Sequence, residues 1–463
     1  MRGDTVDHTH KKVMVDLPLV LFLFCLLFSP PVIPKLNTAI FGAAVGVLFL
    51  LTRYRSQLAE MVKESGIGTF AAMMGVFFGY IGIVTAANLL LGERVQPMHY
   101  VKLAYRFLMI VPVLMVCGLF ICLRARERKF SVFGLAMQFV WATLFQFVLV
   151  LGALVIPELK QYFISVIYRN TGDSYLGIPW VMARRGFGFT NSFVDSFGFG
   201  MGIVGALPLY FVKERRLWIL LTVPCLAMVS FVNVRTGIVI GVMGAVIALP
   251  LLVRAFLELR GSEKGRMALV LLLTFVLFAL FACLVWVCNP LTVHWVLGDF
   301  GDLLGLDLQL ELPTQPSQAA TVPPGIYTDS QTTTSEQLFS DRFWNLPKGF
   351  GVLFGTGHTV YGAEGYPHSD VGYVNDLWLG GVIGCVLLYG AFGLLFVRAF
   401  RASRRLNLKA LILFMAVSMA VFQIKANAIM FNAGINTILP LLFYICHRGE
   451  SEDEVWQMKS GSA

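Results

Sequence analysis

The chain has 463 residues, of which 57% are hydrophobic and 14% are charged, and its formal net charge is +9. A soluble domain carries roughly 25% charged and 45–50% apolar residues, so this composition excludes an ordinary water-soluble fold. Continuous apolar runs of about 20 residues, the length that crosses a bilayer as a helix, recur about a dozen times. The sequence therefore predicts an all-α polytopic membrane protein with about 12 transmembrane helices, built as a single integral membrane domain over residues 1–463.

The candidate spans follow one another through most of the chain. In order they are 16–34, 37–52, 67–91, 101–123, 132–156, 191–212, 217–233, 236–253, 267–288, 372–397, 408–424 and 429–446. The first run ends at Pro30 and Pro31 without a small-residue cleavage site, so we expect it to be retained as a span. Mid-span regions are nearly uncharged; Arg106, and Lys425 between the last two spans, are the exceptions.

Basic residues are concentrated in every second connection between the spans. These connections carry Arg53, Arg55 and Lys63; Arg124, Arg126, Arg128 and Lys129; Lys213, Arg215 and Arg216; Arg254, Arg260, Lys264 and Arg266; and Arg398, Arg401, Arg404, Arg405 and Lys409. The positive-inside rule places these connections, and with them both termini, in the cytoplasm. Much of the net charge is therefore explained by topology, and no nucleic-acid partner is expected.

Two connections on the opposite, outer side are unusually long, at residues 157–190 and 289–371. The second contains a piece rich in proline, threonine, glutamine and serine. Loops of this length in a compact protein usually serve binding or catalysis, so we expect the functional site at the outer face.

Arginines stand at this outer side against the positive-inside trend. Arg184 and Arg185 lie in RRGFGFTNSF before a span, Arg235 lies in the turn VRTG, and Arg342 closes the second long loop. Guanidinium groups bind phosphate oxygens bidentately, and a helix beginning near Asn191 would add free N–H donors. The set predicts a diphosphate site without a metal. The alternative is that each arginine bonds lipid phosphate or carbonyl groups at the interface.

His368 and Asp370 precede the span that begins near residue 372. Histidine titrates near neutral pH and can take a proton from a hydroxyl, and a nearby carboxylate can orient it. Alternatively, His368 anchors the chain at the interface, and Ser369 or Asp370 caps the helix. The sequence has no nucleotide-binding loop, zinc-protease motif or serine-hydrolase motif, and neither a metal nor a cofactor is expected.

Three short signatures carry a family resemblance: RRGFGFTNSF; VRTGIVIG, with Val234 where serine is common; and the stretch from Arg342 through GTG to HSDVGYVNDLWLGGVIG. They resemble signatures of bacterial Wzy-type polysaccharide polymerases and, more distantly, of O-antigen ligases in the same superfamily. HSDVGY followed by GG-x-x-G is more similar to the polymerases.

The resemblance implies a GT-C-like glycosyltransferase in the bacterial inner membrane, with 157–190 and 289–371 as periplasmic loops and the active site on that side. The implied reaction is a metal-independent, inverting transfer of the growing glycan from undecaprenyl diphosphate to a lipid-linked repeat unit. The implied partners are the undecaprenyl-diphosphate-linked oligosaccharide as donor and acceptor, membrane lipids, and a co-polymerase that regulates chain length.

The resemblance also implies roles for individual residues. The diphosphate would be bound by Arg184 or Arg185, Arg235 and Arg342; His368 would be the general base, with Asp370 orienting it; Trp344 and Tyr373 would stack on sugar rings. Aromatic residues at an interface more often only anchor the protein in the membrane.

Two other functions remain open from the sequence. An O-antigen ligase would use the same donor but transfer the glycan to lipid A core. A lipid-linked oligosaccharide flippase or other secondary transporter would be expected to carry charges near the membrane midplane and to have short loops.

Overall fold

The computed structural model of the chain describes residues 15–31, 38–92, 111–171, 188–189, 206–207, 217–233, 235–259, 261–290, 343–358, 371–425 and 438–448, together with residues 100, 293, 369 and 429. All regular structure in these residues is helical. The helices are α1 (Leu17–Phe28), α2 (Thr38–Thr52), η1 (Arg55–Gln57), α3 (Leu58–Glu64), α4 (Ile67–Leu90), α6 (Val111–Glu127), α7 (Val132–Val155), α8 (Pro157–Thr171), η5 (Leu217–Leu221), α11 (Thr222–Asn233), α12 (Arg235–Glu258), α13 (Gly261–Cys288), α16 (Phe350–Phe354), α17 (Gly372–Ala402), α18 (Leu406–Lys425) and a short apolar helix at Ile438–Arg448.

Six of these helices are long and apolar enough to cross a membrane: α4, α7, α12 from Val239, α13, α17 and α18. The clearest case is α13, whose only buried side chains are Met267 and Val285, while Leu272 and Phe275 are exposed. A helix that is apolar on nearly all sides is stable in lipid. The chain is therefore a membrane-embedded helical protein, as predicted. The expected span at 191–212 lies outside the described residues.

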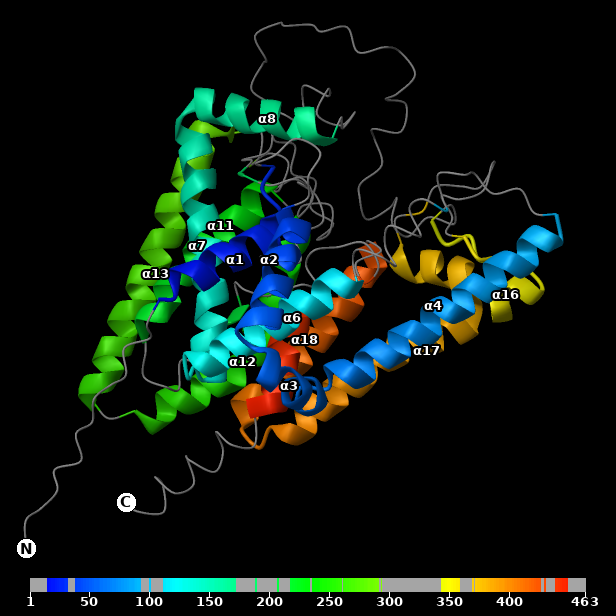
Figure 1. Cartoon of the computed structure of the whole chain (residues 1–463). Helices are drawn as coiled ribbons and strands as arrows, with labels where there is room; N and C mark the ends of the chain where they lie inside the picture. The colour runs from blue at the N-terminus through cyan, green and yellow to red at the C-terminus, as the bar shows by residue number, and fades with distance from the viewer. Residues whose placement is uncertain are drawn as a thin grey trace, which may run out of the picture.

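The helices are joined by one large apolar core. Figure 1 shows α7, α11 and α13 grouped together, with α1 against α7 and α2 against α6. At the other side of the molecule α4 and α17 lie along each other. They are antiparallel, because Phe70 meets Phe392 whereas Ile81 lies beside Gly380. The first long connection, 157–190, begins with helix α8, which packs against α7.

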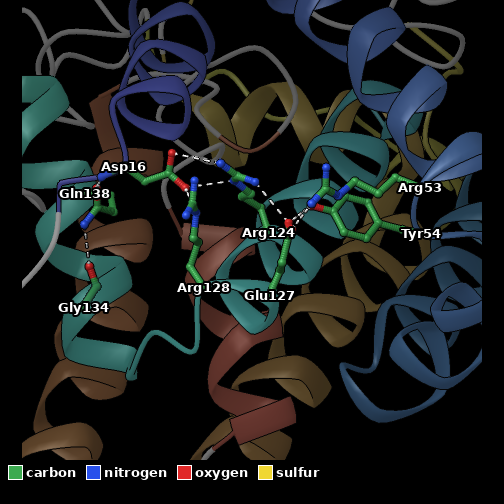
Figure 2. A network of polar contacts seen from close by, with 8 residues as sticks. All are labelled: Asp16, Arg53, Tyr54, Arg124, Glu127, Arg128, Gly134 and Gln138. Carbon is green, nitrogen blue, oxygen red and sulfur yellow. Dashed lines mark hydrogen bonds and ion pairs between the residues drawn. The ribbon is translucent and has the colours of Figure 1, made fainter.

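An ionic network ties the start of α1 to α6 and α7 (Figure 2). The Asp16 carboxylate accepts hydrogen bonds from Arg124, with Nε at 2.8 Å and Nη2 at 3.2 Å, and from Arg128 Nε at 3.0 Å. The backbone N–H of Asp16 donates to Gln138 Oε1 at 3.0 Å. Because α1 has only 12 residues, these polar bonds supply contacts that the short helix cannot provide by burial alone.

Glu127 extends the network, since its carboxylate accepts from Arg53, Tyr54 and Arg124. Burial acts to raise the pKa of Glu127, but the bonds from these three side chains outweigh it and hold the pKa below its usual value. Three further contacts lie beside it: Arg126 to Glu60, His447 to Glu64, and Arg398 to the carbonyls of Lys63 and Glu64. Basic residues from separate connections therefore meet acidic partners at one end of the helices.

Candidate functional site

The structure describes only part of the predicted site. Arg184, Arg185, Arg342, His368 and Asp370 lie outside the described residues. Arg235 is the first residue of α12, and only its backbone is described. Trp344 is exposed. Tyr373 is half-buried, and its hydroxyl donates to the Ala420 carbonyl at 2.9 Å.

The immediate neighbours of three predicted site residues contact one another. Ser369, which stands between His368 and Asp370, donates its hydroxyl to the carbonyl of Phe343 at 2.6 Å. Phe343 directly follows Arg342. Nearby, Trp378 Nε1 donates to the Asn345 carbonyl at 2.8 Å. Two parts of the long connection 289–371, 26 residues apart, are therefore bonded together just before α17.

Asn375 holds the backbone on either side of residue 370. Its Nδ2 donates to the Ser369 carbonyl at 2.8 Å and to the Val371 carbonyl at 3.0 Å. Ser369 Oγ in turn accepts from the Val371 N–H at 3.3 Å. One buried amide from the first turn of α17 thus bonds both of the described residues that flank position 370.

The glycine turn at residues 355–357 also bonds to α17 at this site. The N–H groups of Thr356 and Gly357 donate to the carbonyls of Trp378 and Leu379 at 2.7 and 3.0 Å. Gly355 contributes a close approach, because a Cβ there would lie 2.5 Å from the backbone nitrogen of Gly381. These bonds satisfy the carbonyls that a helix leaves free where it ends.

That helix end is a break inside α17 at Gly381, which has φ 59° and ψ −165°. Asp376 and Tyr389 are 13 residues apart, and in a continuous helix their Cα atoms would be about 20 Å apart. The Tyr389 hydroxyl nevertheless donates to the Asp376 carboxylate at 2.6 Å. The rings of Tyr373 and Tyr389 also meet, with centroids 5.6 Å apart. The helix is therefore bent sharply at Gly381, so that residues 373–376 come close to Tyr389, and the predicted span at 372–397 is not one straight helix.

Asp376 is a site residue that was not predicted from the sequence. Arg106 and Lys425 were the expected exceptions to uncharged spans, whereas Asp376 is a carboxylate only 3% exposed inside an apolar helix. Gln423 Nε2 donates to it at 2.6 Å, from α18. The available signal was the carboxylate itself, since ionisable residues in membrane helices usually have a task.

The arginine-bearing stretch RRGFGFTNSF is described at two residues, Gly188 and Phe189. Phe189 packs against Phe163 of α8, with ring centroids 5.7 Å apart. Gly188 lies so close to α7 that a Cβ there would come within 2.3 Å of Gln146 Nε2. Gly188 and Phe189 are therefore packed on α7 and α8, and none of their described contacts is with residues 343–381.

Replacing Gln146 with leucine should stabilise the protein. Gln146 is fully buried in α7, and within the described part of the chain neither its Oε1 nor its Nε2 has a hydrogen-bond partner. An unsatisfied buried amide costs about 1–3 kcal/mol, and leucine of similar volume removes that cost. We expect the thermal midpoint in detergent to rise by a few degrees. A lower midpoint would show that the amide is satisfied in the native protein.

Gln138 of the same helix provides the matched control. It is equally buried, but its Oε1 accepts from the Asp16 N–H and its Nε2 donates to the Gly134 carbonyl. Gln138→Leu should therefore lower the midpoint, because the Asp16 N–H loses its partner.

No protein-family model matches the chain, and no curated protein matches it in sequence. The fold and the site define a membrane-embedded helical protein in which a long connection is bonded onto a broken helix. The function is therefore inferred from these residues and from the three sequence signatures.

Proposed function

We propose that the chain is a Wzy-type bacterial polysaccharide polymerase. It transfers the growing glycan from undecaprenyl diphosphate to a lipid-linked repeat unit at the periplasmic face of the inner membrane. The full architecture in this proposal has about 12 spans, both termini in the cytoplasm, a GT-C-like arrangement and periplasmic loops at 157–190 and 289–371.

The hydrogen bond from Ser369 to Phe343 carries this proposal. Its two residues adjoin His368 and Asp370 on one side and Arg342 on the other. A base and a diphosphate-binding arginine must both lie within reach of one anomeric carbon, so their neighbours must meet in the fold. They do so over the N-terminal turn of α17.

The reaction needs one proton acceptor and a site for a leaving anion. The acceptor hydroxyl oxygen attacks the anomeric carbon from the face opposite the diphosphate, which inverts the configuration. Its proton passes to His368, and the bond from the anomeric carbon to the phosphate oxygen breaks with its electron pair on the diphosphate. Arg342, Arg235 and Arg185 or Arg184 stabilise that charge, while Asp370 orients His368 and Trp344 and Tyr373 contact the sugars.

The test is transfer by the purified protein in detergent, with undecaprenyl-diphosphate-linked repeat units as the only substrate and a chelator present. A ladder of glycans on a gel establishes a metal-independent polymerase. Transfer only after lipid A core is added would make the protein an O-antigen ligase. The absence of transfer in both cases would favour a flippase or transporter and overturn the proposal.

Arg342→Lys should reduce the rate of this transfer about 10- to 100-fold, nearly as much as Arg342→Ala. Lysine keeps the charge but loses the bidentate geometry on phosphate. The measurement is the initial rate of ladder formation for the two variants side by side. Full activity with lysine would contradict a bidentate diphosphate contact and leave only a contribution of charge.

A further inference from the structure

Three side chains hold the two halves of α17 together across its break. The Asp376 carboxylate accepts from the Tyr389 hydroxyl and from Gln423 Nε2, each at 2.6 Å, through the same oxygen, Oδ2. Gln423 Oε1 accepts from the Ile429 N–H at 3.2 Å. The group therefore connects residues 372–380, residues 382–402, α18 and the chain that follows α18.

Burial of the Asp376 and Gln423 side chains would cost free energy if they had no hydrogen-bond partners. Asp376 is 3% exposed and Gln423 is fully buried, and both lie in helices that are apolar enough to cross a membrane. In such surroundings a carboxylate needs donors, and a hydroxyl or amide needs partners. The same bonds thus become strong and directional, because no water competes for them.

Val371, Val374 and Trp378 of this region form a small apolar cluster with Phe343, apart from the main core, which Leu379 joins. Tyr373 adds a bond to the Ala420 carbonyl of α18 and a ring contact with Tyr389. The polar group around Asp376 adds buried, directional bonds to these contacts. It therefore contributes to the position of the cluster, and with it to the Ser369–Phe343 bond.

We propose that Asp376, Tyr389 and Gln423 form a latch that positions the segments around Phe343 and Ser369, both in the long connection 289–371, for the reaction. The inference rests on the proposed function, because it assigns the latch to that site. The three residues are positioning residues: they act through Ser369, Asn375 and Phe343, and they do not touch the reacting atoms.

An exchange of the two partners tests the latch. Asp376→Leu and Gln423→Leu each break the pair, because leucine neither donates nor accepts a hydrogen bond. The double variant Asp376→Asn/Gln423→Glu keeps one amide and one carboxylate, in the opposite order. Each single variant should have a kcat about 10- to 100-fold lower with little change in KM, and the double variant should recover most of the loss.

A second measurement follows the latch without any substrate. Spin labels at Leu377 and Leu394, in a chain whose eight native cysteines are replaced, report the distance between the two segments of α17. The distance distribution should be narrow in the parent chain and in the double variant, and broad or longer in the single variants.

The outcomes separate the latch from the proposed function. Single variants that keep the narrow distribution, or a double variant that does not recover it, would overturn the latch. A disturbed distribution with unchanged kcat would overturn its positioning role. If the parent chain forms no ladder, the proposed function fails, while the distance measurement still decides whether the latch exists.

Discussion

Gly381→Ala adds only one methyl group, but we expect it to be among the most destabilising substitutions in the protein. At φ 59° and ψ −165°, Gly381 adopts a conformation that is essentially restricted to glycine. An added Cβ would lie 2.4 Å from the Gly355 nitrogen and 2.4 Å from the Leu353 carbonyl oxygen. Both contacts are with backbone atoms, which no side-chain rotation can relieve. We expect a loss of about 3 kcal/mol or more, seen as a lower thermal midpoint in detergent, and a loss of glycan transfer.

Gly393→Ala in the same helix is the control. Gly393 is exposed, has no positive φ, and has no atom within 4 Å of an added Cβ. Alanine is about 1 kcal/mol more favourable than glycine in a helix, so this variant should be as stable as the parent or slightly more stable. Equal midpoints for the two variants would mean that the chain does not break at Gly381.

Helix positions were the feature that the sequence predicted best. α4, α7 and α11 begin and end within a few residues of the predicted spans, because long apolar runs bounded by charge leave few alternatives. The break in α17 was not predictable in the same way. Gly380 and Gly381 stand in an apolar run, and glycine is common in unbroken membrane helices. The break depends on Gly355, which is 26 residues away in the chain and approaches from a separate loop.

In the candidate site, too, local features could be predicted from the sequence, and features that depend on distant residues could not. The glycine turn at 355–357 and the HSD segment were recognisable as local signatures, and their described neighbours do meet through Ser369 and Phe343. Asp376 was overlooked because its significance depends on Tyr389 and Gln423, at 13 and 47 residues' distance. Only the folded chain shows that a tyrosine and a glutamine from two helices converge on one carboxylate.

The role of Asp16 could not be predicted from the sequence either, because its partners are far away in the chain. In sequence Asp16 is the first residue of the predicted span 16–34, at the end of a polar stretch that also holds Asp4 and Asp7. Its partners, Arg124 and Arg128, were interpreted only as positive-inside residues of a cytoplasmic connection. The structure instead pairs these arginines with a protein carboxylate, so part of the basic charge is neutralised internally.

Asp16→Ala should therefore destabilise the protein by about 3 kcal/mol, although Asp16 lies just before α1 and is the first residue of the predicted span. The Asp16 side chain is 2% exposed and that of Arg124 is 15% exposed, so removal of the carboxylate leaves a largely buried guanidinium with one acceptor fewer. Arg128 is 41% exposed and can turn to solvent or lipid phosphate, which limits its share of the loss. The short helix α1 would also lose its ionic link to α6, while the ring contact between Phe22 and Phe120 would remain. Thermal unfolding in detergent should show a midpoint several degrees lower.

Arg254→Ala is the matched control for an ion pair. The Arg254–Glu258 pair has a similar length, 2.9 Å, but its side chains are 61% and 48% exposed and lie on one helix. Such pairs contribute about 0.3–0.5 kcal/mol, so this variant should shift the midpoint very little. If Asp16→Ala shifted the thermal midpoint no more than Arg254→Ala does, the ionic network would contribute no more to stability than an exposed ion pair. A large difference would show that α1 is anchored by its polar end, because burial of apolar side chains alone would leave a 12-residue helix poorly fixed.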